Sequence, residues 1–345
     1  MTDKGGSRNR SNASQIDVAH LAGVSQAAVS RTFTPGASVS DETRCKVMEA
    51  AEKLNYRPNV IARSLISQST NMIGLVIMRF TNPFYARIIR DFTRALQSRG
   101  YWTLLLNVAG SNEVDETLPM ALGYQVDGII VTSATLSSGL ADECARAGTP
   151  VVLFNRYALG SQVNAVYCDS VAGGRMAADL LLDAGHGRIA YVAGEAGSST
   201  NRDRERGFTE RLKERGHSLD LHEQGDFSYE SGQQAAERLL GGDGRPEAVF
   251  CANDLMAMGF LDVAREGMGI RVPEDLSVIG FDDIPMAGWP SYGLTTVRQP
   301  VEKLVETTID VLLNAIQDPE AEMVTKMIPP TLSLRSSVRS GGADE

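Results

Sequence analysis

The sequence predicts an N-terminal three-helix helix-turn-helix head plus a hinge helix, followed by an α/β core of two doubly wound parallel-sheet subdomains. Three observations predict this architecture. Two short helical patterns meet at a glycine, a polar linker follows residue 58, and apolar strands then alternate with amphipathic helices in two successive series. A chain of 345 residues is also too long for one core of ordinary size, so at least two domains are expected.

The head begins with two short helices within residues 17–31. Val18, Ala19 and Ala22 give the first helix an apolar stripe. Gly23 tolerates the positive φ of a helix C-terminus, and Ser25 is a favourable N-cap for the second helix. Two short helices joined by a tight glycine turn are typical of helix-turn-helix units, so DNA is the first partner to consider.

Helices this short need a third helix to pack against, and the segment after Ser40 predicts one. Ser40 is the expected N-cap, and Asp41 and Glu42 lie at the positive end of the helix dipole. Apolar residues follow at helical spacing: Val47, Ala50, Ala51 and Leu54. The three-helix unit is therefore expected to end near Tyr56.

The distribution of charge supports a nucleic-acid partner for the head alone. The whole chain has a formal net charge of -10, which taken alone argues against nucleic acid. Up to Arg63, however, there are nine basic and six acidic residues, a net charge of +3, which leaves -13 for the rest. A basic head on an acidic body favours local phosphate contact with little non-specific binding by the body.

Residues 59–70 form the expected hinge or linker. Pro58 stops the preceding segment, and Asn59 could cap a short helix that includes residues 62–65. That helix is too short to be stable alone, so something has to order it, and DNA is a candidate.

Apolar strands and amphipathic helices alternate from Asn71 onward. The first series predicts a helix over residues 84–99 and strands over residues 72–78, 101–106, 127–131 and 150–154. The second predicts a helix around Leu180, helices over residues 204–215 and 254–266, and strands over residues 188–192, 248–251 and 276–280. This alternation predicts a parallel doubly wound sheet in each half. Ligands bind beyond the carboxyl ends of such strands, so a ligand is expected in a cleft between the halves.

No sequence signal for export, membrane insertion, catalysis or metal binding is found. Residues 1–14 lack the apolar core of a signal peptide, and no later run is long enough to span a bilayer. Four cysteines without paired spacing are expected to be reduced thiols: Cys45, Cys144, Cys168 and Cys251. The sequence therefore predicts a cytoplasmic protein that is not an enzyme, with no catalytic residue, no metal and no cofactor.

Two glycine-containing segments invite a phosphate-binding or catalytic interpretation and do not support it. Neither Gly185-His186 nor Gly241-Gly-Asp-Gly244 matches a phosphate-binding loop, a zinc-protease motif or a nucleophile elbow. His186 is expected to be a turn histidine that bonds to the backbone at a helix end.

Short motifs occur in a fixed order along nearly the whole chain: Asp17-Val-Ala, Ala22-Gly-Val-Ser, Val29-Ser-Arg31, Val39-Ser, Thr43-Arg44, Asn55-Tyr-Arg-Pro-Asn59, Ala62-Arg-Ser-Leu65, Asn82-Pro-Phe-Tyr85, Gly185-His186, Ile189-Ala190, Cys251-Ala-Asn-Asp254, Val272-Pro-Glu-Asp275, Gly280-Phe-Asp-Asp283 and Leu294-Thr-Thr296. In these motifs the chain resembles the LacI/GalR family of bacterial transcriptional regulators from about Ser14 to Val338. The resemblance implies a DNA-binding head, a hinge helix, a periplasmic-binding-protein-like effector core and a homodimer.

Taken together, the pattern and the resemblance predict four segments. They are a disordered tail (1–13), a helix-turn-helix domain (14–58), a hinge helix or linker (59–70) and an effector-binding and dimerisation core (71–345). Within the core, the N-subdomain is expected at about 71–168 plus 299–326, and the C-subdomain at about 169–298 plus 327–340.

The resemblance places Gln26, Ala27 and Arg31 at the major-groove positions of the second helix. Gln can pair with adenine and Arg with guanine, whereas Ala27 offers only a methyl contact. Alternatively, Gln26 is a solvated helix residue. Phosphate contacts are expected from Ser14, Ser25, Ser30, Thr34 and Asn59. Ser14 and Ser25 would serve equally well as helix caps.

In the hinge, the resemblance assigns Leu65 as a wedge between base pairs in the minor groove, with Arg63 as a further DNA contact. Alternatively, Leu65 packs onto the core as ordinary linker.

Eight residues that follow strands or match family ligand positions are the expected effector site: Phe84, Asn155, Arg156, Arg202, Phe227, Asn253, Asp282 and Gln299. Aromatic faces and planar polar groups together suit a sugar or sugar acid. Arg202 and Asp282 are the strongest candidates, because a charge beside a strand end needs a partner. Asn253 and Asp282 could instead cap the helices that follow them. Two arginines against one carboxylate hint at an acidic or phosphorylated sugar, unless Arg156 and Asp282 pair with each other.

The sequence thus predicts a ligand-responsive regulator, most simply a repressor of carbohydrate-utilisation genes, that binds a pseudo-palindromic double-stranded DNA operator as a dimer. One alternative keeps the fold but replaces the sugar with a nucleobase corepressor or a phosphoprotein partner. A sugar-binding transport-type protein and a doubly wound enzyme are the others; the head and the missing signals argue against both. The sequence does not identify the effector, the sign of its effect or the target genes, and it leaves open whether the protein is a dimer or a tetramer. The C-terminus lacks the leucine heptads of a coiled coil, which leans toward a dimer.

Overall fold

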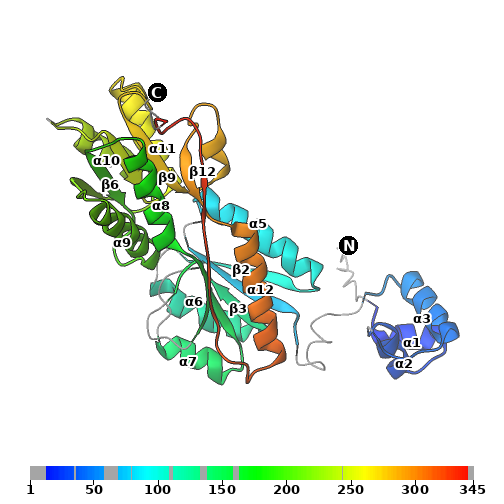
Figure 1. The fold of residues 1–345 in the computed structure, drawn as a ribbon. Coiled ribbons are helices and arrows are strands. Elements are labelled where there is room, and N and C mark those ends of the chain that lie inside the picture. The colour runs from blue at the N-terminus through cyan, green and yellow to red at the C-terminus, as the bar shows by residue number, and fades with distance from the viewer. Residues whose placement is uncertain are drawn as a thin grey trace, which may run out of the picture. The chain divides into compact units, whose positions relative to one another are not determined.

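The computed structural model describes residues 13–34, 36–57, 69–78, 80–108, 112–132, 138–157, 163–242 and 244–340. The chain divides into two units, a head up to Thr70 and a core from Asn71 (Figure 1). The predicted tail up to residue 12 and the predicted hinge over residues 59–68 lie outside the described residues.

The head contains α1 (Gln15–Ala22), α2 (Gln26–Thr32) and α3 (Asp41–Lys53), as predicted. Gly23 ends α1 in the left-handed region at φ 66°. One valine from each helix is fully buried where the three helices meet: Val18, Val29 and Val47. The head therefore folds around a small core of its own, to which each short helix contributes.

The N-subdomain is a six-stranded sheet with helices on both faces. Its strand order is β11-β5-β4-β3-β1-β2, and every neighbouring pair is parallel. Buried side chains place α5 and α12 on one face of the sheet and α6 and α7 on the other (Figure 1). Its elements are β1 (Met72–Met78), α5 (Pro83–Ser98), β2 (Trp102–Val108), α6 (Asn112–Gly123), β3 (Gly128–Val131), α7 (Ser138–Arg146), β4 (Val151–Phe154), β5 (Asn164–Cys168), α12 (Val301–Gln317) and β11 (Thr325–Ile328).

The C-subdomain repeats this plan, with strand order β12-β10-β9-β8-β6-β7. Its strands are parallel except for the edge strand β12, which runs antiparallel to β10. Helix α8 packs with α9, and α10 packs with α11. Its elements are α8 (Ser170–Asp183), β6 (Ile189–Ala193), α9 (Ser199–Glu214), β7 (Leu221–Gln224), α10 (Tyr229–Leu240), β8 (Ala248–Cys251), α11 (Asp254–Asp262), a π-helical turn (Val263–Gly267), β9 (Ser277–Asp282), a 3-10 turn (Pro285–Gly288), β10 (Thr295–Arg298) and β12 (Thr331–Ser333).

The chain passes between the two subdomains three times: from β5 into α8, from β10 into α12, and from β11 into β12. The last passage belongs to the C-terminal segment, red in Figure 1. It follows Ile328, beyond the limit at residue 326 expected from the sequence, because β11 pairs with β5 along its whole length. With three connections, the subdomains can change their relative angle only by small changes at these crossings.

Helix α9 differs most from its predicted limits, since it begins at Ser199 and not at residue 204. Its first turn consists of polar residues with modest helix propensity, which obscure the start of the helix in the sequence. The structure buries that turn against the cleft described below, so tertiary packing and not propensity decides where α9 begins.

Helices α8 and α9 cross at two glycines. A Cβ atom on Gly174 would lie 2.2 Å from the carbonyl oxygen of Arg204, and one on Gly207 would lie 2.1 Å from that of Val171. Only glycine permits the two backbones to approach this closely.

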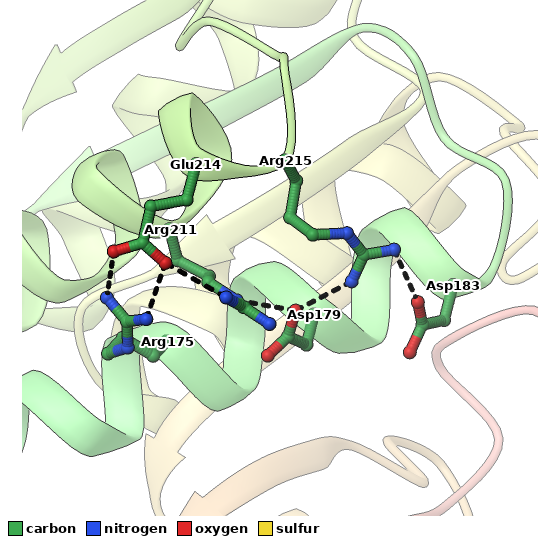
Figure 2. Close-up of polar contacts among 6 residues, drawn as sticks. All are labelled: Arg175, Asp179, Asp183, Arg211, Glu214 and Arg215. Carbon is green, nitrogen blue, oxygen red and sulfur yellow. Dashed lines mark hydrogen bonds and ion pairs between the residues drawn. The ribbon is translucent and has the colours of Figure 1, made fainter.

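Beyond the glycines, a network of ion pairs joins the exposed sides of the same two helices. Figure 2 shows three side chains of α8 facing two of α9 and that of its C-cap residue: Arg175, Asp179 and Asp183 opposite Arg211, Glu214 and the C-cap Arg215. Hydrogen bonds of 2.8 Å join Arg175 to Glu214 and Arg211 to Asp179, and one of 2.9 Å joins Arg215 to Asp183. Arg175 and Arg211 lower the pKa of Glu214 to about 2. Single exposed pairs contribute little, but this network and the glycine crossing act together to fix α9 on α8.

No helix in these described ranges is long and apolar enough to cross a membrane. The four cysteines are free: Cys45 is exposed, and Cys144, Cys168 and Cys251 are buried.

His186 lies in the turn after α8 and is buried, with 3% of its surface exposed. As predicted, it bonds to the backbone at a helix end, because its own N–H donates to the Leu181 carbonyl oxygen at 3.2 Å. Its ring contacts side chains: Nε2 lies 2.8 Å from the Ser277 hydroxyl, and Nδ1 lies 3.5 Å from the Arg339 guanidinium. Burial, followed by the charge of Arg339, lowers the pKa of His186 to about 4.

This lowered pKa predicts a loss of stability on acidification. The folded protein favours the neutral ring. Its contribution to the free energy of unfolding is therefore complete above pH 6.5, the pKa of histidine in the unfolded chain, and is lost as the pH falls from 6.5 towards 4. At pH 5 the loss amounts to about 2 kcal/mol. In urea unfolding, the free energy of unfolding of His186→Gln should fall between pH 7.5 and pH 5 by about 2 kcal/mol less than that of the wild type. An equal acid dependence of the two proteins would contradict this assignment.

Candidate effector cleft and nucleic-acid interface

Helix α2 presents one polar face to solvent and buries the other. Val29 and Thr32 are buried against the rest of the head. The sequence-predicted DNA contacts of this helix are all exposed: Gln26, Ala27, Ser30 and Arg31. Thr34 is also exposed, and its hydroxyl donates to the Ser30 carbonyl oxygen at 2.9 Å. The helix can therefore enter a major groove with this face without any rearrangement of the head.

Ser14 and Ser25 adopt the helix-cap role that the sequence left as an alternative to phosphate contact. Ser14 Oγ accepts a hydrogen bond from the Asp17 backbone N–H at 3.2 Å, and the Asp17 carboxylate accepts one from the Ser14 backbone N–H at 2.8 Å. Ser25 Oγ accepts from the Ala28 backbone N–H at 3.2 Å. Both serines remain exposed, so capping does not remove them from a DNA-facing surface. Asn59, Arg63 and Leu65 lie outside the described residues.

A small cavity lies between the two subdomains of the core, beyond the carboxyl ends of their strands. Each subdomain contributes to its wall, and the first turns of α5 and α9 complete it. Its lining residues are Asn82, Phe84, Tyr85, Asn155, Arg156, Thr200, Arg204, Phe227, Asn253 and Asp282. The sequence thus predicted both the place of the cleft and six of the residues that line it.

A buried ion pair forms the C-subdomain wall of this cavity. Arg204, on α9, donates to Asp282, at the end of β9, at 3.3 Å, and its guanidinium lies 3.7 Å from the centre of the Phe281 ring. Burial raises the pKa of Asp282, whereas the charge of Arg204 and the hydrogen bond from Gln299 oppose that rise. Gln299 Nε2 donates to the Asp282 carboxylate at 2.7 Å. Gln299 therefore orients Asp282, although it does not line the cavity itself.

Four buried polar atoms at or beside the cavity have no hydrogen-bond partner among the described residues: Asn155 Oδ1, Arg156 Nη1, Arg204 Nε and Gln299 Oε1. Buried polar atoms are nearly always bonded in folded proteins, so such a cluster needs an explanation. A polar ligand that supplies the missing donors and acceptors provides one.

The backbone is strained at the same place. Among the described residues, seven non-glycine residues have a positive φ, and four of them lie at the ends of strands around the cavity: Asn155 (57°), Phe227 (69°), Asp282 (124°) and Asp283 (56°). For an aromatic residue such as Phe227 this conformation is a genuine outlier. Strained backbone of this kind is found at ligand-binding sites, where the surrounding structure stabilises it.

Asn253 confirms the structural alternative considered for it. Its Oδ1 accepts from the Met256 backbone N–H at 3.0 Å, which caps α11, and its Nδ2 donates to the Phe227 carbonyl oxygen at 3.0 Å. Asn253 thereby holds Phe227 in its strained conformation, and Asn253 itself also lines the cavity. Asp282 does not cap the 3-10 turn that follows it, which begins after Ile284.

Arg202 does not lie in the cavity, contrary to its place among the strongest sequence candidates. Its side chain is 49% exposed and bonds to Tyr157. Arg204, which sequence reasoning missed, occupies the cavity wall instead. Helical phase could have found it, since Arg204, Phe208 and Leu212 form one buried stripe at intervals of four residues.

The cavity measures about 30 Å³, and a water molecule needs roughly 10–15 Å³ by the same measure. A sugar ring therefore enters only when the two subdomains separate. Two larger hollows belong to the N-subdomain: one of about 200 Å³ lies between α7, the start of β4 and the end of α12, and one of about 290 Å³ lies along α12 beside the edge strand β11. None of the unbonded buried atoms found in the described part of the chain lies on their walls, so they carry no comparable signal for a ligand.

Tyr157 connects the two subdomains beside the cavity. Its hydroxyl donates to Asp203 Oδ2 at 2.8 Å and accepts from Arg202 Nη2 at 3.0 Å, and both of these residues lie on α9. Its ring packs on Tyr167 of β5, with 4.8 Å between the ring centres. Separation of the subdomains has to break these two hydrogen bonds, so Tyr157 acts as a latch on the cleft.

A helix-turn-helix head joined to a two-lobed core with a polar cleft defines a class of protein, the transcriptional regulators whose DNA binding responds to a small ligand. Comparison with known proteins agrees. Residues 16–59 match the bacterial regulatory proteins of the lacI family, and residues 178–338 match a periplasmic binding protein-like domain.

Relatives and solved structures match the chain over nearly its full length. The HTH-type transcriptional repressor PurR of Photobacterium profundum is 34% identical over 327 residues, which cover 94% of this chain and 98% of PurR. The ribose operon repressor of Escherichia coli K12 is 34% identical over 329 residues, covering 94% and 99%. A crystal structure of the lac repressor dimer bound to operator and the anti-inducer ONPF superposes with a TM-score of 0.86 at 27% identity, covering 95% and 99%.

The chain belongs to the lacI family of bacterial regulatory proteins. It is a ligand-responsive transcriptional repressor, and both of these relatives are named as repressors.

The latch predicts that Tyr157→Phe opens the cleft more often. Phenylalanine keeps the packing on Tyr167 but removes both hydrogen bonds to charged partners. Because these bonds stabilise only the closed form, their loss should raise the population of the open cleft roughly 10-fold or more. Cys168, at the end of β5, is close enough to Arg204 and Asp282 of the other subdomain for their charges to affect its pKa, so opening of the cleft should expose it. In the closed form, burial raises the pKa of its thiol to about 12 and protects it from thiol reagents. In a chain with Cys168 as the sole cysteine, Tyr157→Phe should speed labelling by that factor.

Tyr167→Phe is the matched control, since no hydrogen bond of the Tyr167 hydroxyl joins the subdomains in the described structure. A second background with Cys251 as the sole cysteine reports unfolding of the C-subdomain core. Equal acceleration at Cys251, or no acceleration at Cys168, would contradict the latch.

Proposed function

We propose that the protein represses transcription in the cytoplasm by binding a pseudo-palindromic operator as a homodimer, with an affinity set by a sugar-like effector in the cleft between the core subdomains. The relatives support this reading: one is named for the ribose operon, and the lac repressor structure is a dimer bound to operator. The cluster of unbonded buried polar atoms at the cleft is the observation that carries the effector role. In this proposal the cleft binds and releases its ligand unchanged.

On the DNA side, we assign base contacts to Gln26, Ala27 and Arg31, because they lie on the exposed face of α2. The expected phosphate contacts are Ser14, Ser25, Ser30, Thr34 and Asn59, with Arg63 and Leu65 in the minor groove. This assignment rests on exposure for the residues of the head and on the family resemblance for those of the hinge.

On the ligand side, we assign the effector contacts to seven of the residues that line the cavity: Phe84, Asn155, Arg156, Thr200, Arg204, Phe227 and Asp282. Amide, guanidinium and carboxylate groups outnumber aromatic rings among them, and such groups bind vicinal hydroxyls in pairs. This balance favours a carbohydrate over a nucleobase, which would use the two phenylalanine rings as its main contacts.

The two sites communicate through the angle between the core subdomains in this proposal. The effector, Tyr157 and the three crossings fix that angle, and β1 of the N-subdomain follows directly on the hinge. A ligand that favours one angle changes DNA affinity by its differential binding to the two states. A coupling of about 1–3 kcal/mol corresponds to roughly a 5- to 150-fold change in affinity.

Arg31→Ala should weaken binding to an operator selected from genomic fragments by the wild-type protein. An arginine paired with guanine contributes about 1–3 kcal/mol of discrimination, so specific affinity should fall roughly 5- to 150-fold while non-specific affinity changes much less. Lys46→Ala is the matched control, because Lys46 lies on α3 and is already paired with Glu42 at 2.7 Å. Equal losses in the two variants would assign Arg31 a purely electrostatic contribution.

Asp282→Asn leaves Arg204 without its charge partner and should lower the thermal midpoint. At temperatures below that midpoint, the variant should lose the response to the effector and keep DNA binding. Asparagine has the same shape and tolerates a positive φ, but one of its two terminal atoms is an N–H donor, so it cannot accept a hydroxyl hydrogen bond at each terminal atom as a carboxylate does. Titration of the wild-type operator complex with neutral sugars, sugar acids, sugar phosphates and purines identifies the active class. The variant should then need at least about ten times more of the active compound. Asp275→Asn, at a surface pair with Arg271, is the control. A purine as the active compound would overturn the carbohydrate assignment and keep the regulator.

A further inference from the structure

We propose that the effector of this cleft carries an anionic group, a carboxylate or a phosphate, which binds the guanidinium of Arg156. The inference rests on the proposed effector role of the cleft and names the chemical class of its ligand.

Arg156 is a buried charge without a counter-charge among the residues that the structure describes. It follows β4, lines the cavity and is 3% exposed. Its Nη1 atom is buried and has no hydrogen-bond partner, and no carboxylate of the described residues lies within 4 Å of its guanidinium. A buried guanidinium in this condition lowers the stability of the folded protein unless something else supplies the missing charge.

The other charges at the cleft are already engaged with one another. Asp282 pairs with Arg204 and accepts from Gln299, so the pairing of Arg156 with Asp282 that the sequence left open is not formed. Arg202 is turned towards Tyr157 and Asp203. The lining residues therefore carry two positive charges and one negative charge, and Arg156 is the unmatched one.

A hydroxyl group would satisfy the unbonded Nη1 atom but would leave the charge of Arg156 unbalanced. A carboxylate or a phosphate satisfies both, because its oxygens match the planar donors of a guanidinium. The ligand would place this anion on the N-subdomain side, beside Arg156 and Asn155, and its hydroxyls towards Asp282 and Arg204 of the C-subdomain. Its charge would thereby help to close one subdomain on the other.

The first test needs no ligand. Arg156→Met removes the charge and keeps an unbranched side chain of similar reach, so the full-length variant should be more stable than the wild type, with a thermal midpoint higher by about 2–4 °C for each kilocalorie regained. Arg238→Met, at an exposed arginine paired with Glu223, is the control and should not raise the midpoint. A lower midpoint for Arg156→Met would mean that Arg156 stabilises the fold, and this would overturn the proposal.

The second test uses matched sets of compounds on one carbon skeleton: a neutral aldose, the sugar acid derived from it and its phosphate ester, at equal ionic strength. An anionic member should stabilise the wild type and shift its operator affinity, whereas the neutral parent should do neither. Arg156→Met should lose roughly 30-fold or more of the affinity for that member. Arg156→Lys keeps the charge without the planar fork and should retain part of the affinity. Comparison of the acid with the ester separates carboxylate from phosphate.

The outcomes distinguish this proposal from the function on which it rests. Binding of a neutral sugar with equal affinity to the wild type and Arg156→Met would overturn the anion and keep the sugar-responsive repressor. No effect of any carbohydrate on stability or operator binding would overturn both.

Discussion

The ion pair between Arg204 and Asp282 constrains the C-subdomain wall of the cleft, because neither charge reaches bulk water. Removing one partner of such a pair costs about 3–5 kcal/mol, so the helix and the strand end that carry the two charges have to stay in register. The glycine crossing and the ion-pair network fix α9 on α8, and this places Arg204 opposite Asp282. The same helix carries Asp203 and Arg202, to which Tyr157 bonds. The position of one helix therefore decides both the shape of the cavity and the latch beside it.

Most of the core could be predicted from the sequence for a simple physical reason. Strands buried on both faces of a parallel sheet are continuous apolar runs, and the run from Met72 to Met78 becomes β1 with the same limits. The weaker edge strands gave no such signal, since β11 is mostly exposed and its residues are mixed in polarity. The head was predicted well because its caps and its turn glycine are local features, which depend on residues a few positions apart.

The residues of the cleft could be predicted from the sequence only in part. Topology, together with the family resemblance, predicts residues that follow strands, such as Asn155 and Phe227. A residue on a helix also requires the helical phase. The sequence predicts Arg202 for the site, whereas the structure exposes Arg202 and buries Arg204, two residues further along α9. The open question of whether Arg156 pairs with Asp282 could be answered only by the structure, because pairing depends on the distance between two subdomains.

The strained backbone around the cavity has a consequence for any search for variants with a new effector preference. Positions 155, 227 and 282 have a positive φ, so most replacements there would destabilise the loop before they altered recognition. Phe84 and Thr200 lie in the first turns of α5 and α9, where the backbone is helical and accepts many side chains. A library that varies these two helical positions should therefore retain far more folded members, and the molecule separates a fixed part of its cleft from an adaptable one.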